Sequence, residues 1–252
     1  MQKVSLLSIG STCKTWLSPL TKNMFLSFTF LASITLPVTT LAKNQTDLHK
    51  STETVQSDYL RSDASVNPSD VQIIFVDLQP ELTRNSRTVK PFVLGANAAV
   101  LAHVASITGI PVTFSTVPLQ GKFSDPIPEL QEYVSGKNTI RRVKAGTFME
   151  PALISTLARH HRRVLVVSGY ATEVAVLQTA LAALKAGYQV YVPVDAIGSP
   201  SGRTEAAALH QMEYAGVVTG SVMALAAQLA PDFSRKPGSE VLKSFSDLRP
   251  AE

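Results

Sequence analysis

The sequence predicts an α/β fold of three layers, in which helices cover both faces of a parallel β-sheet. From residue 71 onward, short apolar runs alternate with longer segments of helical periodicity, which is the order that builds parallel sheets. Runs such as RVLVVSG at 163–169 have no polar face, and this indicates strands buried on both sides. The composition, 45% hydrophobic and 17% charged in 252 residues, is typical of a globular protein with a sizeable core. We therefore expect one domain at residues 70–233.

The predicted strands and helices follow one another in a regular order. We expect six strands, at residues 71–78, 111–117, 139–143, 163–169, 188–194 and 217–220. The predicted helices lie at residues 91–110, 128–134, 151–160, 172–187, 202–216 and 221–229. The helix at 172–187 ends on a glycine, as many helices do. Its apolar side chains are expected in the core, namely Leu177, Ala180, Leu181 and Leu184. Residues 234–252 are predicted to be a mobile polar tail.

The first 42 residues have the form of an export signal. Lys14 and Lys22 precede an apolar run that begins near Met24 and closes on the small residue Ala42, the arrangement of a secretory signal peptide. We predict cleavage of residues 1–42, export to a bacterial periplasm and only transient membrane contact. The alternatives are an uncleaved anchor, since the uncharged stretch is about long enough to span a bilayer, and a translation start at Met24. Residues 43–69 are polar and predict a flexible linker.

Charge and cysteine content argue against two classes of function. The net charge is +4, but the first 42 residues hold Lys3, Lys14 and Lys22 and no acid, so 20 basic and 19 acidic residues remain. Because these nearly balance, we expect no nucleic-acid partner. The single cysteine, Cys13, lies in the predicted signal. The mature protein would therefore contain no thiol, no disulfide and no cysteine metal ligand.

Polar residues follow three of the predicted strands, where chemistry gathers in parallel sheets. Asp77 follows the first strand, and burial there would raise its pKa and suit it to proton transfer; a turn aspartate is the alternative. Arg142 and Lys144 end the third strand, where a cation could stabilise Asp77 or an anionic intermediate; a solvated strand edge is the alternative. Residues 168–176 form a strand, a glycine turn and a helix N-terminus, whose free N–H groups suit an anion.

Three segments in this order resemble the isochorismatase-like hydrolases of the cysteine hydrolase superfamily. They are FVDLQ at 75–79, TIRRVKAGTF at 139–148 and VVSGYATEVAVLQTALAALKAGYQVYVPVDAIGS at 166–199. The third segment is long and specific, and the end of the chain is most similar to the branch of uncertain substrate. The resemblance spans nearly all of residues 71–233. It implies a Rossmann-like fold with a six-stranded parallel sheet, and relatives that often form homo-oligomers.

The resemblance also implies roles for single residues. The family commonly uses an Asp, Lys and Cys triad, in which a thiolate attacks an amide or similar carbonyl and the Asp moves its proton. Asp77 matches the acid/base, Arg142 matches the lysine by its distance from Phe148, and Lys144 is the second choice. A cis peptide is implied at Tyr170–Ala171, with the N–H groups of Ala171 and Ala175 as oxyanion donors. The oxyanion and substrate contacts are expected from Gln79, Tyr170, Ala171 and Thr172.

The nucleophile position departs from the family pattern, because it holds Ala175. Alanine cannot attack a carbonyl. Ser168 and Thr172 lie nearby, but neither has a histidine base beside it in sequence, and turn and N-cap roles explain them more simply. Residues 115–123 lack the histidines through which the nicotinamidase branch holds a metal, and the five histidines of the chain show no ligand spacing. We expect neither a metal nor a cofactor.

The sequence thus leaves three functional hypotheses. In the first, the protein hydrolyses an unidentified small molecule without a thiol, through proton transfer by Asp77. True isochorismatases lack the cysteine and protonate a vinyl ether from the aspartate, which is the chemistry that this hypothesis needs. In the second, the domain is catalytically inactive and binds a small ligand or acts as a structural partner. In the third, an unrecognised nucleophile keeps it active.

Overall fold

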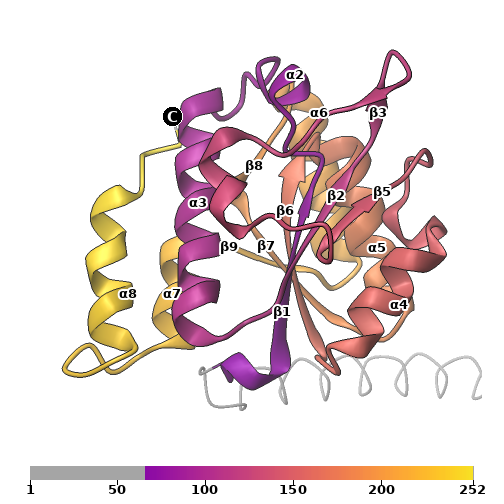
Figure 1. Cartoon of the computed structure of the whole chain (residues 1–252). Helices are drawn as coiled ribbons and strands as arrows, with labels where there is room; N and C mark the ends of the chain where they lie inside the picture. Colours follow the sequence, from indigo (N-terminus) through magenta and orange to yellow (C-terminus); the bar gives the residue numbers. More distant parts are fainter. Residues whose placement is uncertain (1–65, 252) are drawn as a thin grey trace, which may run out of the picture. The chain divides into compact units, whose positions relative to one another are not determined.

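Six parallel strands form the centre of the fold in a computed structural model of the chain, which describes residues 66–251 (Figure 1). Their order across the sheet is β5-β2-β1-β6-β7-β9, and the short β8 pairs with β6. The strands are β1 (Val71–Val76), β2 (Val112–Thr116), β5 (Thr139–Arg141), β6 (Val164–Tyr170), β7 (Gln189–Pro193), β8 (Ile197–Gly198) and β9 (Val218–Gly220). The predicted parallel sheet is confirmed. The predicted signal peptide and most of the predicted linker lie outside the described residues.

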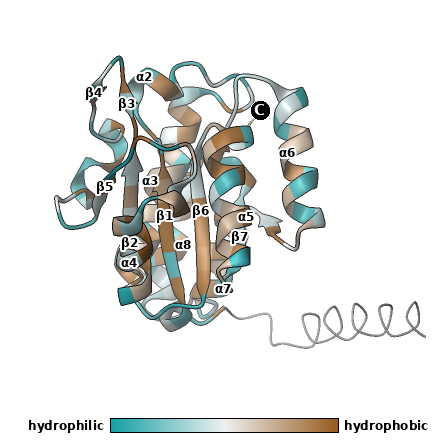
Figure 2. Cartoon of the chain, turned by 90° about the vertical axis from the view of Figure 1, so that its right-hand side faces the viewer, coloured by the Kyte–Doolittle hydropathy of each residue, from teal (hydrophilic) through white to brown (hydrophobic). Residues whose placement is uncertain are grey.

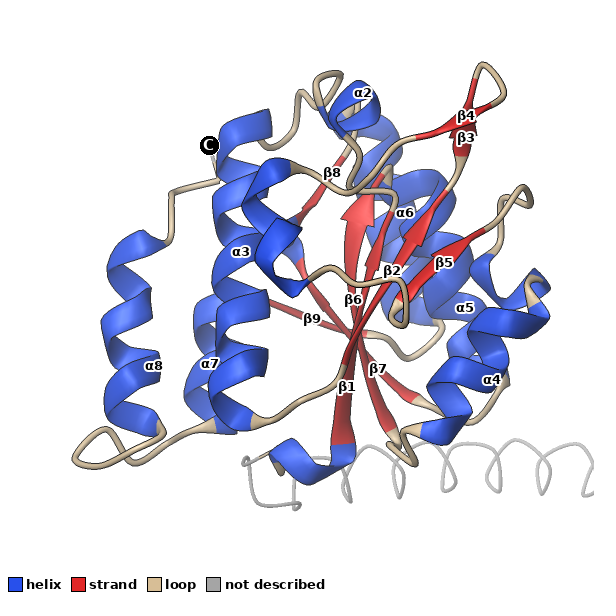
Figure 3. Cartoon of the chain, viewed as in Figure 1, coloured by secondary structure: helices blue, strands red, loops and turns tan. Residues whose placement is uncertain are grey.

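Helices cover both faces of this sheet, as predicted (Figures 1 and 3). One face carries α3 (Pro91–Thr108), α7 (Val222–Leu229) and α8 (Gly238–Ser244), and the other carries α4 (Pro151–Arg159), α5 (Leu177–Lys185) and α6 (Gly202–Tyr214). Shorter elements were not predicted: α2 (Pro80–Thr83) and the hairpin of β3 (Pro118–Leu119) and β4 (Lys122–Phe123). The remaining turns are helical: η1 (Pro68–Asp70), η2 (Pro128–Tyr133), η3 (Thr147–Met149), η4 (Thr172–Val176), η5 (Val194–Ala196) and η6 (Phe245–Asp247).

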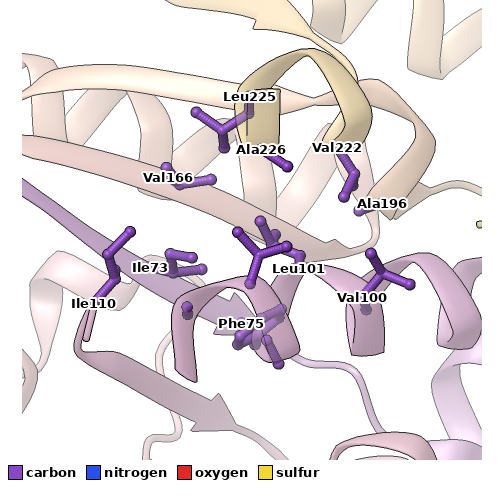
Figure 4. Close-up of a cluster of buried hydrophobic side chains, with 14 of the residues drawn as sticks. Ile73, Phe75, Val100, Leu101, Ile110, Val166, Ala196, Val222, Leu225 and Ala226 are labelled. Carbon is purple, nitrogen blue, oxygen red and sulfur yellow. The ribbon is translucent and has the colours of Figure 1, made fainter. Parts of the chain in front are cut away.

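The strands are apolar on both faces because each face packs into a separate core. Successive side chains of a strand point to opposite faces, so Ile73 and Phe75 join the core under α3 while Ile74 and Val76 join the core under α5. Figure 4 shows Ile73 and Phe75 close to Leu101 of α3. Each wholly buried side chain of this kind contributes roughly 1.5–3 kcal/mol. The hydrophobic colour along β1 and β6 in Figure 2 follows from this double burial.

Helix α3 is apolar around most of its circumference because neighbours cover it on several sides. It begins at Pro91, where the missing N–H matters least, and ends at Thr108, with Gly109 as its cap at a left-handed φ of 70°. It contacts the sheet core as well as η2, α7 and α8. By length and composition it is the one helix of residues 66–251 that could cross a membrane. Its place in the core accounts for that apolar character.

The predicted polar tail is instead a packed helix, so this expectation was wrong. Val241 of α8 is fully buried, and Phe245 packs edge-on against Phe233 with ring centroids 6.0 Å apart. The wholly buried Asn97 of α3 holds the end of the chain, because its amide pairs with both the N–H (2.9 Å) and the carbonyl oxygen (3.1 Å) of Arg249. Apolar residues at 241, 245 and 248 form one helical stripe that the overall polar composition concealed.

Candidate active site

The carboxyl ends of β1, β2, β5 and β6 meet at one edge of the sheet. Asp77 follows β1 with a left-handed φ of 55°, and its N–H donates to the carbonyl oxygen of Ser115 at 2.8 Å. In the sheet register, Val76 lies beside Ser115 of β2 and beside Gly169 of β6. A Cβ at Gly169 would lie 2.3 Å from the carbonyl oxygen of Val76, so glycine permits this close approach. The register thereby places Asp77 between the ends of β2 and β6.

Asp77 forms a buried ion pair with Arg142. An Nη2 hydrogen of Arg142 is donated to Oδ2 of Asp77 at 2.5 Å, and the two side chains are only 1% and 7% exposed. The guanidinium also donates from Nε to the hydroxyl oxygen of Ser115 at 3.0 Å and from Nη1 to the carbonyl oxygen of Lys144. A buried guanidinium with a partner at each nitrogen is held in one orientation.

The second oxygen of the Asp77 carboxyl, Oδ1, takes no part in the ion pair. Oδ1 is buried, and no hydrogen-bond partner for it exists within residues 66–251. Burial raises the pKa of Asp77 to about 6, against the opposing charge and hydrogen bond of Arg142. A carboxyl with a pKa near neutrality and an unpaired oxygen is suited to give or take a proton.

The structure distinguishes the two candidate cations. Arg142 reaches Asp77, whereas the exposed ammonium of Lys144 donates to the carbonyl oxygen of Met149 at 3.1 Å. Lys144 contributes only its backbone carbonyl oxygen to the site. Arg142 is thus the cation beside Asp77.

The nucleophile position lies on a π-helix where the sequence predicts a continuous α-helix. The peptide between Tyr170 and Ala171 is cis, as the resemblance implies, and η4 follows directly before α5 begins. The Ala175 side chain is buried, and its N–H donates to the carbonyl oxygen of Ala171 at 3.0 Å. This N–H, expected as an oxyanion donor, is therefore already committed. Periodicity in sequence cannot reveal one inserted residue in a helical turn, although such turns are frequent at functional sites.

Two other side chains expected to contact the substrate, those of Gln79 and Thr172, already have hydrogen-bond partners within the protein. The amide nitrogen of buried Gln79 donates to the carbonyl oxygen of Val117 (3.0 Å) and the hydroxyl of Ser124 (2.9 Å), and its amide oxygen accepts from the N–H of Val117 (2.9 Å). Gln79 thus pairs with the backbone beyond β2 rather than pointing an unused group at a substrate. The hydroxyl of Thr172 lies 2.8 Å from Oε1 of Glu205, consistent with a structural role.

Tyr170 and Ser168 both lie near the carboxyl end of β6 and are buried. Tyr170 is buried, and desolvation, followed by the charge of Glu173, raises its pKa. The Ser168 hydroxyl donates to the carbonyl oxygen of Ala196 at 2.6 Å, so it links β6 to η5.

Sequence reasoning missed Ser115, which contacts both Arg142 and the backbone of Asp77. The signal was a polar residue near the end of an otherwise buried strand. In the part of the chain that the structure describes, no three His, Cys, Asp or Glu side chains gather as metal ligands would. The absence of a metal stays a prediction.

Known proteins are similar to this chain in sequence and in fold. Residues 71–223 match the family described as "Isochorismatase domain". The chain is 32% identical over 155 residues to isochorismatase domain-containing protein 2 of Rattus norvegicus, covering 61% of this chain and 71% of the relative. It is 24% identical over 169 residues to the probable hydrolase YcaC of Escherichia coli, covering 67% and 81%. The crystal structure of that YcaC gene product, described as an octameric hydrolase of unknown specificity, matches with a TM-score of 0.70 at 23% identity, over 75% of this chain and 93% of the other.

Proposed function

Because the chain belongs to the isochorismatase domain family of hydrolases, we propose that it hydrolyses a small molecule by proton transfer through Asp77 and without a thiol. The observation that carries the proposal is the asymmetry of the Asp77 carboxyl. Arg142 holds one oxygen, and the other is buried and unpaired. Ala175 supplies no nucleophile, so the proposed chemistry uses the Asp77 carboxyl and a water molecule in place of a thiol.

A pKa of about 6 suits Asp77 to act first as an acid. At neutral pH about a tenth of such a group carries its proton, an ample fraction for general acid catalysis. With a vinyl ether, Asp77 would protonate the terminal carbon, and the resulting oxocarbenium ion would add water. The proton lost by that water returns to Asp77, and the hemiketal collapses to a carbonyl compound and an alcohol. Arg142 would stabilise the carboxylate while the proton is absent.

The alternative is a domain that binds a small ligand without turnover. One observation favours it: Gln79, Thr172 and the N–H of Ala175 are all satisfied within the chain. A site in which these three contacts are internally paired offers fewer groups to a transition state. The binding hypothesis therefore stays as the second candidate.

The experiment is a turnover assay of the purified chain on a panel of vinyl ethers and amides. We expect vinyl ether hydrolysis, reduced at least about 100-fold in kcat/KM by Asp77→Asn. The matched control is Asp70→Asn, because Asp70 lies at the opposite end of the same strand and pairs with the exposed Arg163. Full activity of Asp77→Asn would refute proton transfer by Asp77.

Ala175→Cys separates the two candidates further. Amide hydrolysis by this variant would show an intact pocket that lacks only the nucleophile. Ligand binding without turnover in the wild type would favour the binding hypothesis. The octameric YcaC supports the further proposal of a homo-oligomer, which light scattering on the purified chain would measure.

A further inference from the structure

Strand β2 holds both members of the ion pair through Ser115 and its neighbour. The carbonyl oxygen of Ser115 accepts the N–H of Asp77 (2.8 Å), and the carbonyl oxygen of Thr116 accepts the N–H of Arg142 (2.9 Å). Ser115 also accepts the Nε hydrogen of Arg142 on its hydroxyl at 3.0 Å. We propose that Ser115 is a positioning residue, whose hydroxyl holds the Arg142 guanidinium against Asp77.

The burial of the guanidinium makes this hydroxyl consequential. Arg142 and Ser115 are each 1% exposed, so no solvent replaces a lost partner at Nε. A buried donor without an acceptor is strongly disfavoured. Without the hydroxyl, the guanidinium is expected to turn away in search of another acceptor and to weaken its contact with Asp77.

The proton affinity of Asp77 reports this positioning. Among the described residues, Arg142 is the charged group that lowers the pKa of Asp77 against the effect of burial. A guanidinium that turns away loses part of this influence, so the pKa of Asp77 rises. A merely structural serine would change stability and leave this pKa in place. The inference rests on the proposed function only in that the Asp77 proton is taken to be the reacting one.

The test is a carbon-13 NMR titration of the Asp77 carboxyl in the full chain, with its signal assigned by its absence in Asp77→Asn. Ser115→Ala is expected to make Asp77 about tenfold weaker as an acid, so that its pKa rises by about one. Ser115→Thr keeps a hydroxyl and is expected to restore the wild-type titration. Ser244→Ala is the control, because Ser244 is buried and its hydroxyl donates to Val241 in α8.

A folded Ser115→Ala protein with an unchanged or lowered Asp77 pKa would overturn the proposal. If that variant fails to fold, the nearly isosteric Ser115→Cys serves instead, because a thiol is a much weaker acceptor; an unchanged titration there is equally decisive. The titration needs no substrate. A wild type without turnover would therefore defeat the proposed function and leave this result standing.

Discussion

The unfolding free energy of Asp77→Asn, taken relative to that of the wild type, should rise as the pH rises. Burial raises the pKa of Asp77 from 3.8 to about 6, so the folded state binds this proton more tightly than the unfolded state. The stability that Asp77 contributes is therefore complete below about pH 4 and is lost as the pH rises through about 6. The difference between the two pKa values corresponds to about 3 kcal/mol. Asn cannot titrate, so the variant avoids this loss.

The assay is urea unfolding followed by far-ultraviolet circular dichroism for both proteins, at intervals from about pH 4 to about pH 8. The difference in unfolding free energy, variant minus wild type, should rise by about 3 kcal/mol across this range. Contributions from distant titrating groups cancel in the difference. Asp70→Asn controls for the loss of a partly exposed carboxylate just before the same strand, since Asp70 pairs with the exposed Arg163.

A flat difference would refute this reasoning, and a falling one would reverse it. A fall would mean that attraction to Arg142 outweighs the burial of Asp77, so that the native carboxyl is a stronger acid than an exposed one. Such a group would hold almost no proton at neutral pH. The proposal of Asp77 as a general acid would then fail together with the stability prediction.

Two further predictions concern the scaffold that carries the site. Gly169→Ala should lower the unfolding free energy by about 1–3 kcal/mol or more, since its Cβ would lie 2.3 Å from the Val76 carbonyl oxygen. Gly136 has open space around it, so Gly136→Ala should change the unfolding free energy by less than about 0.5 kcal/mol. Equal effects of the two substitutions would contradict the close-approach argument. Asn97→Ala removes both hydrogen bonds to Arg249, so it should expose the amides of α8 to hydrogen exchange. The unfolding free energy should fall by about 2–4 kcal/mol. Unchanged protection of the α8 amides would show that packing alone holds the helix.

The sheet was predictable because a strand buried on both faces is apolar at most positions. The runs at 71–78 and 163–169 correspond to Val71–Val76 and Val164–Tyr170, with errors only at the ends. Helix α8 was not predictable from composition, since its apolar stripe is thin and the residues around it are charged. The π-turn at η4 was hidden for another reason: it changes hydrogen bonding and leaves hydrophobic periodicity almost intact.

The choice between Arg142 and Lys144 illustrates where sequence reasoning stops. Residues two apart in a strand share a face, so both cations would point the same way if β5 continued. The strand ends at Arg141, while the N–H of Arg142 still bonds to Thr116. The chain bends before Lys144, and the two side chains separate. The length of an edge strand depends on the rest of the fold, so local pattern alone could not decide between them.

A raised pKa alone would not have identified the site either. Burial also raises the pKa of Asp195 in η5, directly after β7. The Oδ1 of Asp195, however, accepts the N–H of Val222 at 2.9 Å and thereby caps α7. Asp77 differs because its Oδ1 has no partner within residues 66–251, while Arg142 fixes its Oδ2. Burial thus raises the pKa of both aspartates, but one caps a helix and the other is proposed to transfer a proton. The unpaired oxygen beside a fixed cation distinguishes the two.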